Sequence, residues 1–135
     1  LSSGLNALRL LKKESKKIKI AGVTTLTSLN DKDLREIGYN KNVKDLVVHQ
    51  AKLAKKAKLD AIVCSGHEIR LVKRVFKKEI ITPGIKIHNT KNDQKRVMKA
   101  KDAFAAGSDW LVIGRSITNG NIKKNIQSLL EILED

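Results

Sequence analysis

The chain has 135 residues, and its 28 lysines and arginines against 14 aspartates and glutamates give a formal net charge of +14. Hydrophobic residues make up 41% of the sequence, which is enough apolar surface for a folded core and excludes a disordered chain. We expect no membrane span, because no apolar run approaches the roughly 18 residues that a span needs. The single cysteine, Cys64, excludes a disulfide framework and favours a reducing, cytoplasmic location.

The strong positive charge points first to a nucleic-acid-binding protein. However, most of the excess consists of lysines spread along helical segments, and aromatic side chains that could stack on bases are few and widely spaced. A basic nucleic-acid-binding protein therefore stays as an alternative, and non-specific binding to polyanions is expected in any case.

Hydrophobic periodicity predicts helices that alternate with short strands. The helices are expected over residues 5–17, 31–37, 43–59, 65–76, 94–106 and 121–133. The strands are expected over residues 18–24, 60–64, 79–82 and 109–113, with a polar loop over 86–93. Strands this short and continuously apolar are typical of a parallel sheet covered by helices, so the pattern predicts an α/β fold. Four strand–helix units make either a small open domain or half of a (β/α)8 barrel.

Polar clusters at residues 24–28, 65–67, 83–92 and 114–116 follow the four predicted strands, at the edge where parallel α/β proteins place their sites. Gly114 and Arg115 could hold a phosphate, because glycine lets the backbone N–H approach an anion and arginine offers a planar fork of donors. A turn glycine beside a surface cation is an equally good interpretation. The rigid turn at Pro83 projects Lys86 forward, or simply ends a strand. The hydroxyls of residues 24–28 could contact a polar ring, or cap the next helix.

No arrangement typical of a metal site or of catalysis is found in the sequence. The three histidines, His49, His67 and His88, lie in different units and pair with no carboxylate at helical spacing, so we expect no metal. An Asp-x-Lys-x-x-Asp segment and a Ser-His-Asp arrangement are both absent. We therefore predict no catalytic residue in this chain.

Five segments in series resemble orotidine 5′-phosphate decarboxylase of the bacterial type, over essentially the whole chain. They are VTTLTS (23–28), LDAIVCS (59–65), ITPGIK (81–86), DQKR (93–96) and DWLVIGRSI (109–117). The resemblance implies the C-terminal half of a (β/α)8 TIM barrel, as a single partial domain over residues 1–135. In that family the enzyme converts orotidine monophosphate to uridine monophosphate and CO2 without a cofactor, in pyrimidine biosynthesis.

The resemblance also implies roles for individual residues. Arg115, the backbone of Gly114 and Gln94 would hold the nucleotide phosphate, and Thr27 would contact the pyrimidine. Lys86 stands where the family usually has arginine, so the charge is kept but the bidentate fork is lost. The family's catalytic lysine and aspartates lie on the first three strands, so the resemblance implies a fragment that is inactive alone.

Two further interpretations stay open at this stage. The chain could be a non-catalytic module that binds phosphate or nucleotide. The family also forms homodimers, and because a half barrel has open strand edges that invite pairing, two copies could close a barrel-like dimer.

Overall fold

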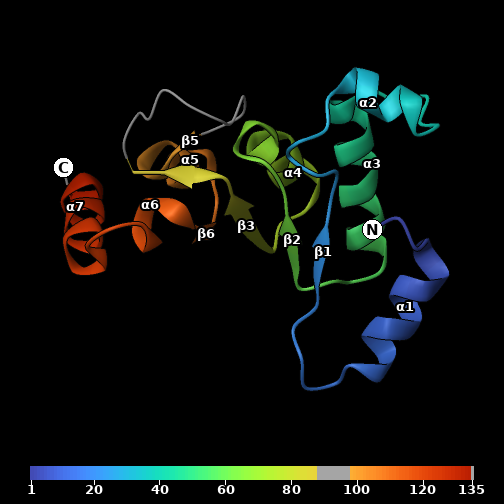
Figure 1. Ribbon diagram of the computed structural model, residues 1–135. Helices are drawn as coiled ribbons and strands as arrows, with labels where there is room; N and C mark the ends of the chain where they lie inside the picture. Colours follow the sequence, from blue (N-terminus) through green and yellow to red (C-terminus); the bar gives the residue numbers. More distant parts are fainter. Residues whose placement is uncertain (88–97, 135) are drawn as a thin grey trace.

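The computed structural model describes residues 1–87 and 98–134, in which helices and strands alternate (Figure 1). The helical elements are α1 (Leu5–Glu14), α2 (Asp31–Glu36), α3 (Val43–Lys56), the 3-10 turn η1 (Gly66–Glu68), α4 (Ile69–Val75), α5 (Ala100–Ala106), α6 (Arg115–Thr118) and α7 (Ile122–Glu134). The strands are β1 (Ala21–Val23), β2 (Ala61–Val63), β3 (Glu79–Pro83), β4 (Ile85–Lys86), β5 (Met98–Lys99) and β6 (Trp110–Val112).

Four strands form one parallel sheet in the order β1-β2-β3-β6. Its register pairs Val23 with Val63, Val63 with Ile81, and Ile81 with Trp110. Helices lie in the connections between successive strands, as parallel pairing requires. The prediction of an α/β fold built from four parallel strand–helix units is confirmed.

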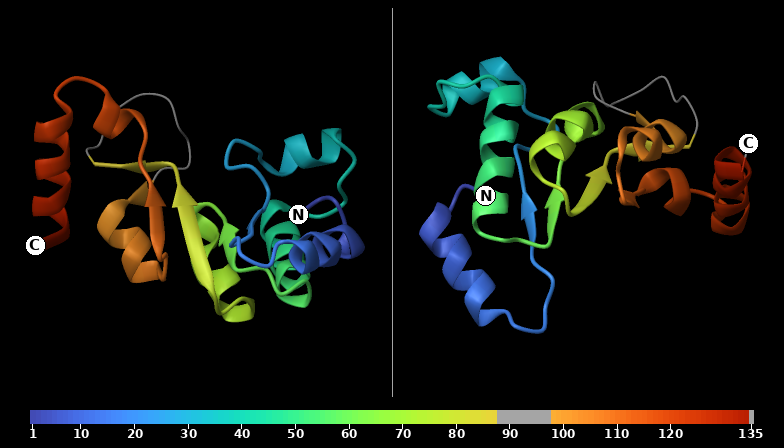
Figure 2. Two further views of the ribbon diagram at one scale, coloured as in Figure 1. Left: turned by 90° about the horizontal axis from the view of Figure 1, so that it is seen from below. Right: turned by 180° about the vertical axis from the view of Figure 1, so that it is seen from behind.

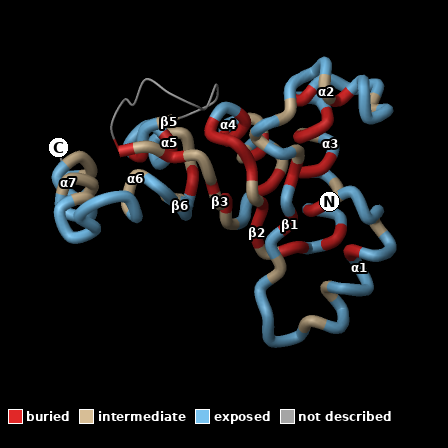
Figure 3. Tube along the Cα trace, in the orientation of Figure 1, coloured by how far each residue is buried: buried red, intermediate tan, exposed pale blue. Residues whose placement is uncertain are grey.

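The two faces of this sheet differ in burial. On one face Ile62 and Ile80 are fully buried, and the core around them comes mainly from α3 and α4 (Figure 3). On the other face the apolar side chains of Val23, Trp110 and Val112 are 47%, 57% and 52% exposed. Because parallel sheets are normally covered on both faces, this sheet has one face without a partner layer in the described part of the chain.

Two aspartates hold the beginnings of neighbouring strands together. Asp60, just before β2, accepts a hydrogen bond from the backbone N–H of Ile20 (2.8 Å) and pairs with Lys12. Asp109, just before β6, accepts from the N–H of Ile80 (2.8 Å) and pairs with Lys73 (2.9 Å). Each carboxylate thus ties the start of its own strand to the start of the neighbouring strand in the sheet: β2 to β1, and β6 to β3.

A second, two-stranded sheet corrects the predicted loop and helix after Pro83. In this sheet Ile85 pairs with Met98 and Lys86 with Lys99, where a polar loop and the start of a helix were expected. Helix α5 begins only at Ala100, because Lys99 keeps an extended backbone in order to pair with Lys86. Residues 88–97 lie outside the described part, so the prediction for 94–97 stays untested.

Helix α7 lies beyond β6, at the opposite end of the molecule from α1 (Figures 1 and 2). It contacts α5 and α6, and it contains no buried residue. The four-residue helix α6 precedes it and was not predicted from the sequence. The C-terminal part of the chain is therefore less buried than the part built around α3 and α4 (Figure 3).

Candidate functional site

The carboxyl ends of the four parallel strands bring the predicted site loops to one edge of the sheet. The loop after β1 carries Thr27, β4 follows β3 and carries Lys86, and Gly114 and Arg115 follow β6. Gln94 falls outside the described residues, so its predicted place in the site stays a prediction.

The loop after β1 is fixed by hydrogen bonds from its threonines. The hydroxyl of Thr24 donates to the carbonyl of Val63 (2.9 Å) and so joins the ends of β1 and β2. The backbone N–H and the hydroxyl of Thr25 both donate to Oε1 of Gln50, at 2.9 and 3.2 Å. Thr27 lies further along the loop and is half-buried. These anchors leave Thr27, rather than Thr24 or Thr25, as the threonine of this loop whose hydroxyl is available to a ligand.

Gln50, in α3, belongs to this edge of the sheet and was not among the predicted site residues. Its side chain is 5% exposed and its amide oxygen is the shared acceptor for Thr25. A glutamine within an apolar helical stripe is the signal that could have shown this, because a buried amide needs hydrogen-bond partners. Beside it lies a hollow of about 200 Å³. The lining residues are Ser2, Thr24, Thr25, Leu26, Leu29, Leu34, Ile37, Tyr39, Leu46 and Gln50.

Gly114 and Arg115 form the corner between β6 and α6. The carbonyl of Gly114 accepts hydrogen bonds from the N–H of Ile117 (2.8 Å) and Thr118 (3.2 Å), which starts the helix. A Cβ at Gly114 would meet open space, so an incoming group can reach this backbone closely. Arg115 is exposed and makes no ion pair within residues 1–87 and 98–134. The corner therefore offers a guanidinium and first-turn backbone N–H groups to an anion.

Lys86 lies in strand β4, where it is half-buried and pairs through its backbone with Lys99. This position differs from the polar loop over residues 86–93 that was expected from the sequence. A short two-stranded sheet directly after β3 holds the backbone of Lys86. This limits the positions that its ammonium group can reach.

The loop after β2 offers no nucleophile. Burial, together with the negative charge of Glu68, raises the pKa of the Cys64 thiol to about 12, so the thiol stays protonated at neutral pH. Ser65 caps η1 by accepting a hydrogen bond from the N–H of His67 (3.3 Å). Gly66 is packed against Met98, since a Cβ there would lie 2.8 Å from the Met98 sulfur. The loop thus has a structural role.

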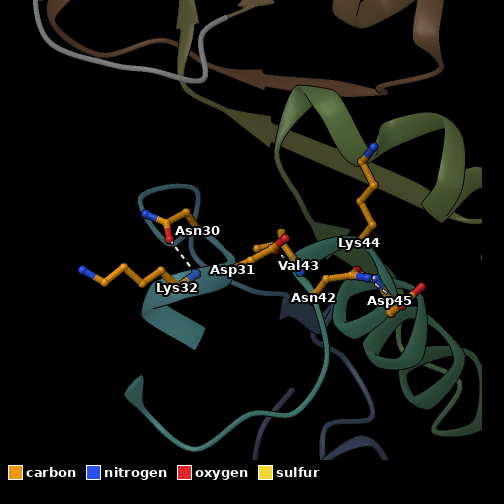
Figure 4. Close-up of a pocket in the computed structure, with 7 residues that line it drawn as sticks. All are labelled: Asn30, Asp31, Lys32, Asn42, Val43, Lys44 and Asp45. Atoms are coloured by element: carbon orange, nitrogen blue, oxygen red, sulfur yellow. Dashed lines mark hydrogen bonds between the residues drawn. The ribbon is translucent and has the colours of Figure 1, made fainter. Parts of the chain in front are cut away.

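A larger hollow, of about 670 Å³, lies between the beginnings of α2 and α3 (Figure 4). Its polar groups are used in helix capping: Asn30 Oδ1 accepts from the N–H of Lys32 (2.8 Å), and Asn42 Oδ1 accepts from the N–H of Asp45 (2.8 Å). Asp31 also accepts from the N–H of Val43 (2.8 Å), which ties the two helices together. Asn30 thus caps α2, and this hollow is a helix junction rather than a substrate site.

Among residues 1–87 and 98–134, histidine, cysteine, aspartate and glutamate side chains nowhere gather in groups of three that could hold a metal ion. In those same segments, helices long and apolar enough to cross a membrane are absent.

Comparison with known proteins explains the arrangement of strands and loops. Residues 1–126 match the model of the orotidine 5′-phosphate decarboxylase / HUMPS family. The chain belongs to this family. An orotidine 5′-phosphate decarboxylase of Coxiella burnetii is 46% identical over 117 residues, which cover 84% of this chain and 49% of the relative. One of Wolbachia pipientis is 42% identical over 125 residues, covering 90% and 55%.

Solved structures of the family share the fold. The orotidine 5′-phosphate decarboxylase of Lactobacillus acidophilus superposes with a TM-score of 0.79 at 24% identity, covering 98% of this chain and 60% of that structure. The Methanocaldococcus jannaschii decarboxylase, in complex with the inhibitor BMP, gives a TM-score of 0.69 at 21% identity, covering 98% and 58%. The predicted part of a (β/α)8 barrel is confirmed, and the chain spans about half the length of the curated relatives it matches.

Proposed function

We propose that this chain is the phosphate-binding half of an orotidine 5′-phosphate decarboxylase barrel, and that alone it binds nucleoside monophosphate without decarboxylating it. The observation that carries the proposal is the corner at Gly114 and Arg115, where an exposed guanidinium without an ion-pair partner among the described residues follows a parallel strand. Membership of the family supplies the ligand class: a nucleotide with a 5′-phosphate.

Each proposed contact follows from the chemistry of its side chain. The planar guanidinium of Arg115 donates two parallel hydrogen bonds to phosphate oxygens, and the N–H groups at Gly114 add backbone donors. Lys86 and Gln94 complete the phosphate site from the segment after β3, and the Thr27 hydroxyl binds the pyrimidine at the other end of the edge. The lysine at position 86 acts as a point charge, so this side of the site holds phosphate with less directional precision than arginine would.

Lack of turnover follows from where the reaction takes place. The phosphate lies far from the reacting carbon. Its binding therefore lowers the transition-state energy only when catalytic groups are present at that carbon. In the family those groups, a lysine and aspartates, lie on the first three strands. This chain holds only the contacts to the phosphate, and these need no cofactor or metal. The free thiol of Cys64 fits a cytoplasmic protein.

Calorimetric titration of the purified chain with uridine 5′-monophosphate tests the proposal. We expect binding that Arg115→Ala weakens roughly 10- to 150-fold, because a hydrogen bond to a charged group contributes about 1.5–3 kcal/mol. The matched control is Arg74→Ala, which removes an exposed arginine from the end of α4 and leaves binding unchanged. Uridine without phosphate binds much more weakly. Equal affinity of the wild type and Arg115→Ala would contradict the assignment.

A second candidate function, binding of nucleic acid, is favoured by an uneven distribution of charge. The ends of α1, α3 and α4 at the amino edge of the sheet gather basic residues, namely Arg9, Lys12, Lys13, Lys16, Lys17, Lys19, Lys55, Lys56, Lys58, Lys77 and Lys78. Several of them line a hollow of about 320 Å³ between α1 and α3. These residues, here called the basic end, lie at the amino ends of the strands, whereas Arg115 lies at the carboxyl ends. Binding at the basic end is therefore independent of the nucleotide site.

A further inference from the structure

A basic hollow lies where α1 and α3 end, on the side of the sheet where the strands begin (Figure 1). Its volume is about 320 Å³, and six residues of the described chain line it. Five of these six are basic and none is acidic: Arg9, Lys12, Lys13, Lys56 and Lys58, with Ala57 as the sixth. Positions 9, 12 and 13 are three and four residues apart, so they lie on one face of α1. Basic side chains from the ends of two helices thus line one small volume.

The positive charge around the basic hollow is only partly neutralised. Lys12 pairs with Asp60, whereas the other four basic residues make no ion pair within residues 1–87 and 98–134. The C-termini of α1 and α3 each add about half a negative charge. Together with Asp60 they offset about two of the five positive charges, so an excess of about three remains. Because like charges at short range repel each other, an anion with several charges would be stabilised here.

Lys58 has a backbone conformation that its residue type disfavours. Its φ of 58° is left-handed, and it is the one non-glycine residue with a positive φ in the described part of the chain. It directly follows Ala57, the C-cap of α3, where a left-handed residue is usually glycine because a Cβ makes this conformation costly. Backbone strain of this kind concentrates at ligand-binding sites. Here the strained residue is one of the five cations of the basic hollow.

We propose that the basic hollow binds a condensed phosphate chain, as an inorganic oligophosphate or as the triphosphate group of a nucleotide. Neighbouring groups in such a chain share an oxygen, so several negative charges lie within a small volume, and lysine and arginine are the side chains that bind phosphate. In nucleic acid each phosphate carries a single charge and a sugar separates it from the next, which suits the wider surface of the basic end instead. The proposal goes beyond the nucleotide-phosphate site, because Arg115 lies at the opposite, carboxyl ends of the strands.

Calorimetric titration with inorganic triphosphate tests the basic hollow, in the Arg115→Ala chain so that the proposed nucleotide site does not contribute. We expect saturable binding at about 0.15 M salt. Lys13→Ala with Lys56→Ala should weaken it roughly 5- to 30-fold, because each lysine loses an ion pair with the ligand. The control, Lys41→Ala with Lys44→Ala, removes the same charge near the start of α3 and leaves the affinity unchanged. Equal weakening by both pairs, or no saturable binding by a folded chain, would overturn the proposal.

The variant Lys58→Gly separates a binding role from a structural one. Glycine adopts the left-handed backbone without strain, so the melting temperature without ligand is expected to rise. Loss of the ammonium group is expected to weaken triphosphate binding roughly 2- to 5-fold. A lysine with only a structural role would change the melting temperature and not the affinity. Unchanged affinity of Lys58→Gly for triphosphate would therefore overturn the proposal.

Parallel titrations identify the source of the phosphate chain. If inorganic triphosphate binds at least as tightly as uridine 5′-triphosphate, the phosphate chain alone is the ligand, whereas tighter binding of the nucleotide shows that the nucleoside contributes. Inorganic monophosphate is expected to bind far more weakly to the Arg115→Ala chain, and equal binding of it would overturn the proposal. Tighter binding of a short DNA duplex at the same phosphate concentration would also overturn it and favour nucleic acid. None of these outcomes depends on binding of uridine 5′-monophosphate, which tests the nucleotide site separately.

Discussion

At the scale of single residues, Asp60 has three polar partners although it lies outside the candidate site. It accepts from Lys12 and from the N–H of Ile20, and lies 3.7 Å from the ammonium of Lys78. The hydrogen bonds from Lys12 and Ile20 lower the pKa of this carboxyl below its usual value. For Asp109, partial burial acts to raise the pKa, but hydrogen bonds from Lys73 and Ile80 outweigh it and lower the pKa.

These lowered pKa values predict how stability depends on pH. A carboxyl with a lowered pKa stabilises the fold above its unfolded pKa of about 3.9, and this contribution is lost as the pH falls through the folded pKa. Melting temperatures measured from pH 6 downward should therefore be steady and then fall below about pH 4. Asp60→Asn should lower the melting temperature at pH 6 and make the fall below about pH 4 shallower. An unchanged slope would show that Asp60 does not carry this linkage.

Gly66 gives a second prediction at this scale, because Met98 occupies the space that a side chain there would need. A Cβ on Gly66 would lie 2.9 Å from the Met98 Cβ and 2.8 Å from its sulfur, so Gly66→Ala must displace β5. Overpacking of this kind costs about 1–3 kcal/mol of unfolding free energy. The rate of alkylation of buried Cys64 measures this change, because the protonated thiol reacts only after opening. Gly114→Ala, which meets open space, is the control; equal rates in both variants would contradict the account.

Sequence alone could indicate Gly114 and Arg115, because both belong to a short run that ends an apolar strand. The structure adds that Arg115 is exposed and that the corner is open to an incoming group. The buried amide of Gln50 could be suspected from its place in an apolar stripe, but its partner Thr25 could not be predicted, since this hydrogen bond joins residues 25 positions apart. Such contacts depend on how α3 packs on the sheet, which local spacing does not determine.

At the scale of elements, the predicted helix ends at residues 17 and 59 were three residues too late, because α1 ends at Glu14 and α3 at Lys56. The predicted stop of helix 94–106 at Gly107 is confirmed, and this glycine has a positive φ of 106° that favours glycine. The predicted start of the same helix was wrong at residues 98 and 99. There the pairing of β5 with β4, and the packing of Met98 on Gly66, outweigh the helical composition of the segment. Tertiary contacts decided this boundary.

Three of the four predicted strands were longer than the observed ones for a related reason. The segment 18–24 contains only three residues of β1, because the preceding Ile18 is exposed and Asp60 fixes the chain at Ile20. Apolar composition indicates where a strand passes through the sheet, whereas hydrogen-bond pairing sets its length. Helix α6 was missed because four residues are too few to show a periodic pattern.

At the scale of the whole molecule, the uneven charge makes a prediction about polyanions. If the basic end binds nucleic acid, the logarithm of affinity for a DNA duplex should fall linearly with the logarithm of salt concentration. Lys13→Glu with Lys56→Glu should weaken binding and make this slope shallower by about one unit for each DNA phosphate that the variant no longer neutralises. The control is Lys32→Glu with Lys44→Glu, at the opposite edge. Equal weakening by both pairs would show that net charge alone is responsible.

The count of four strand–helix units could be made from the sequence, where it left a small open domain and half of a barrel as alternatives. The pattern could not show that one sheet face stays exposed, because a continuously apolar strand predicts burial on both faces. The exposure of Trp110 and Val112 is therefore a property that only the assembled sheet reveals.

The most direct test of the central claim, a nucleotide-phosphate site at the carboxyl edge of this half barrel, is a ¹H–¹⁵N spectrum recorded during titration with uridine 5′-monophosphate. We predict saturable shifts at the backbone amides of Gly114, Arg115 and Thr27, with none at Lys56 and Lys58 on the opposite edge. Arg115→Ala should abolish them. Shifts confined to the basic end, or no saturable shift in a folded chain, would contradict the account.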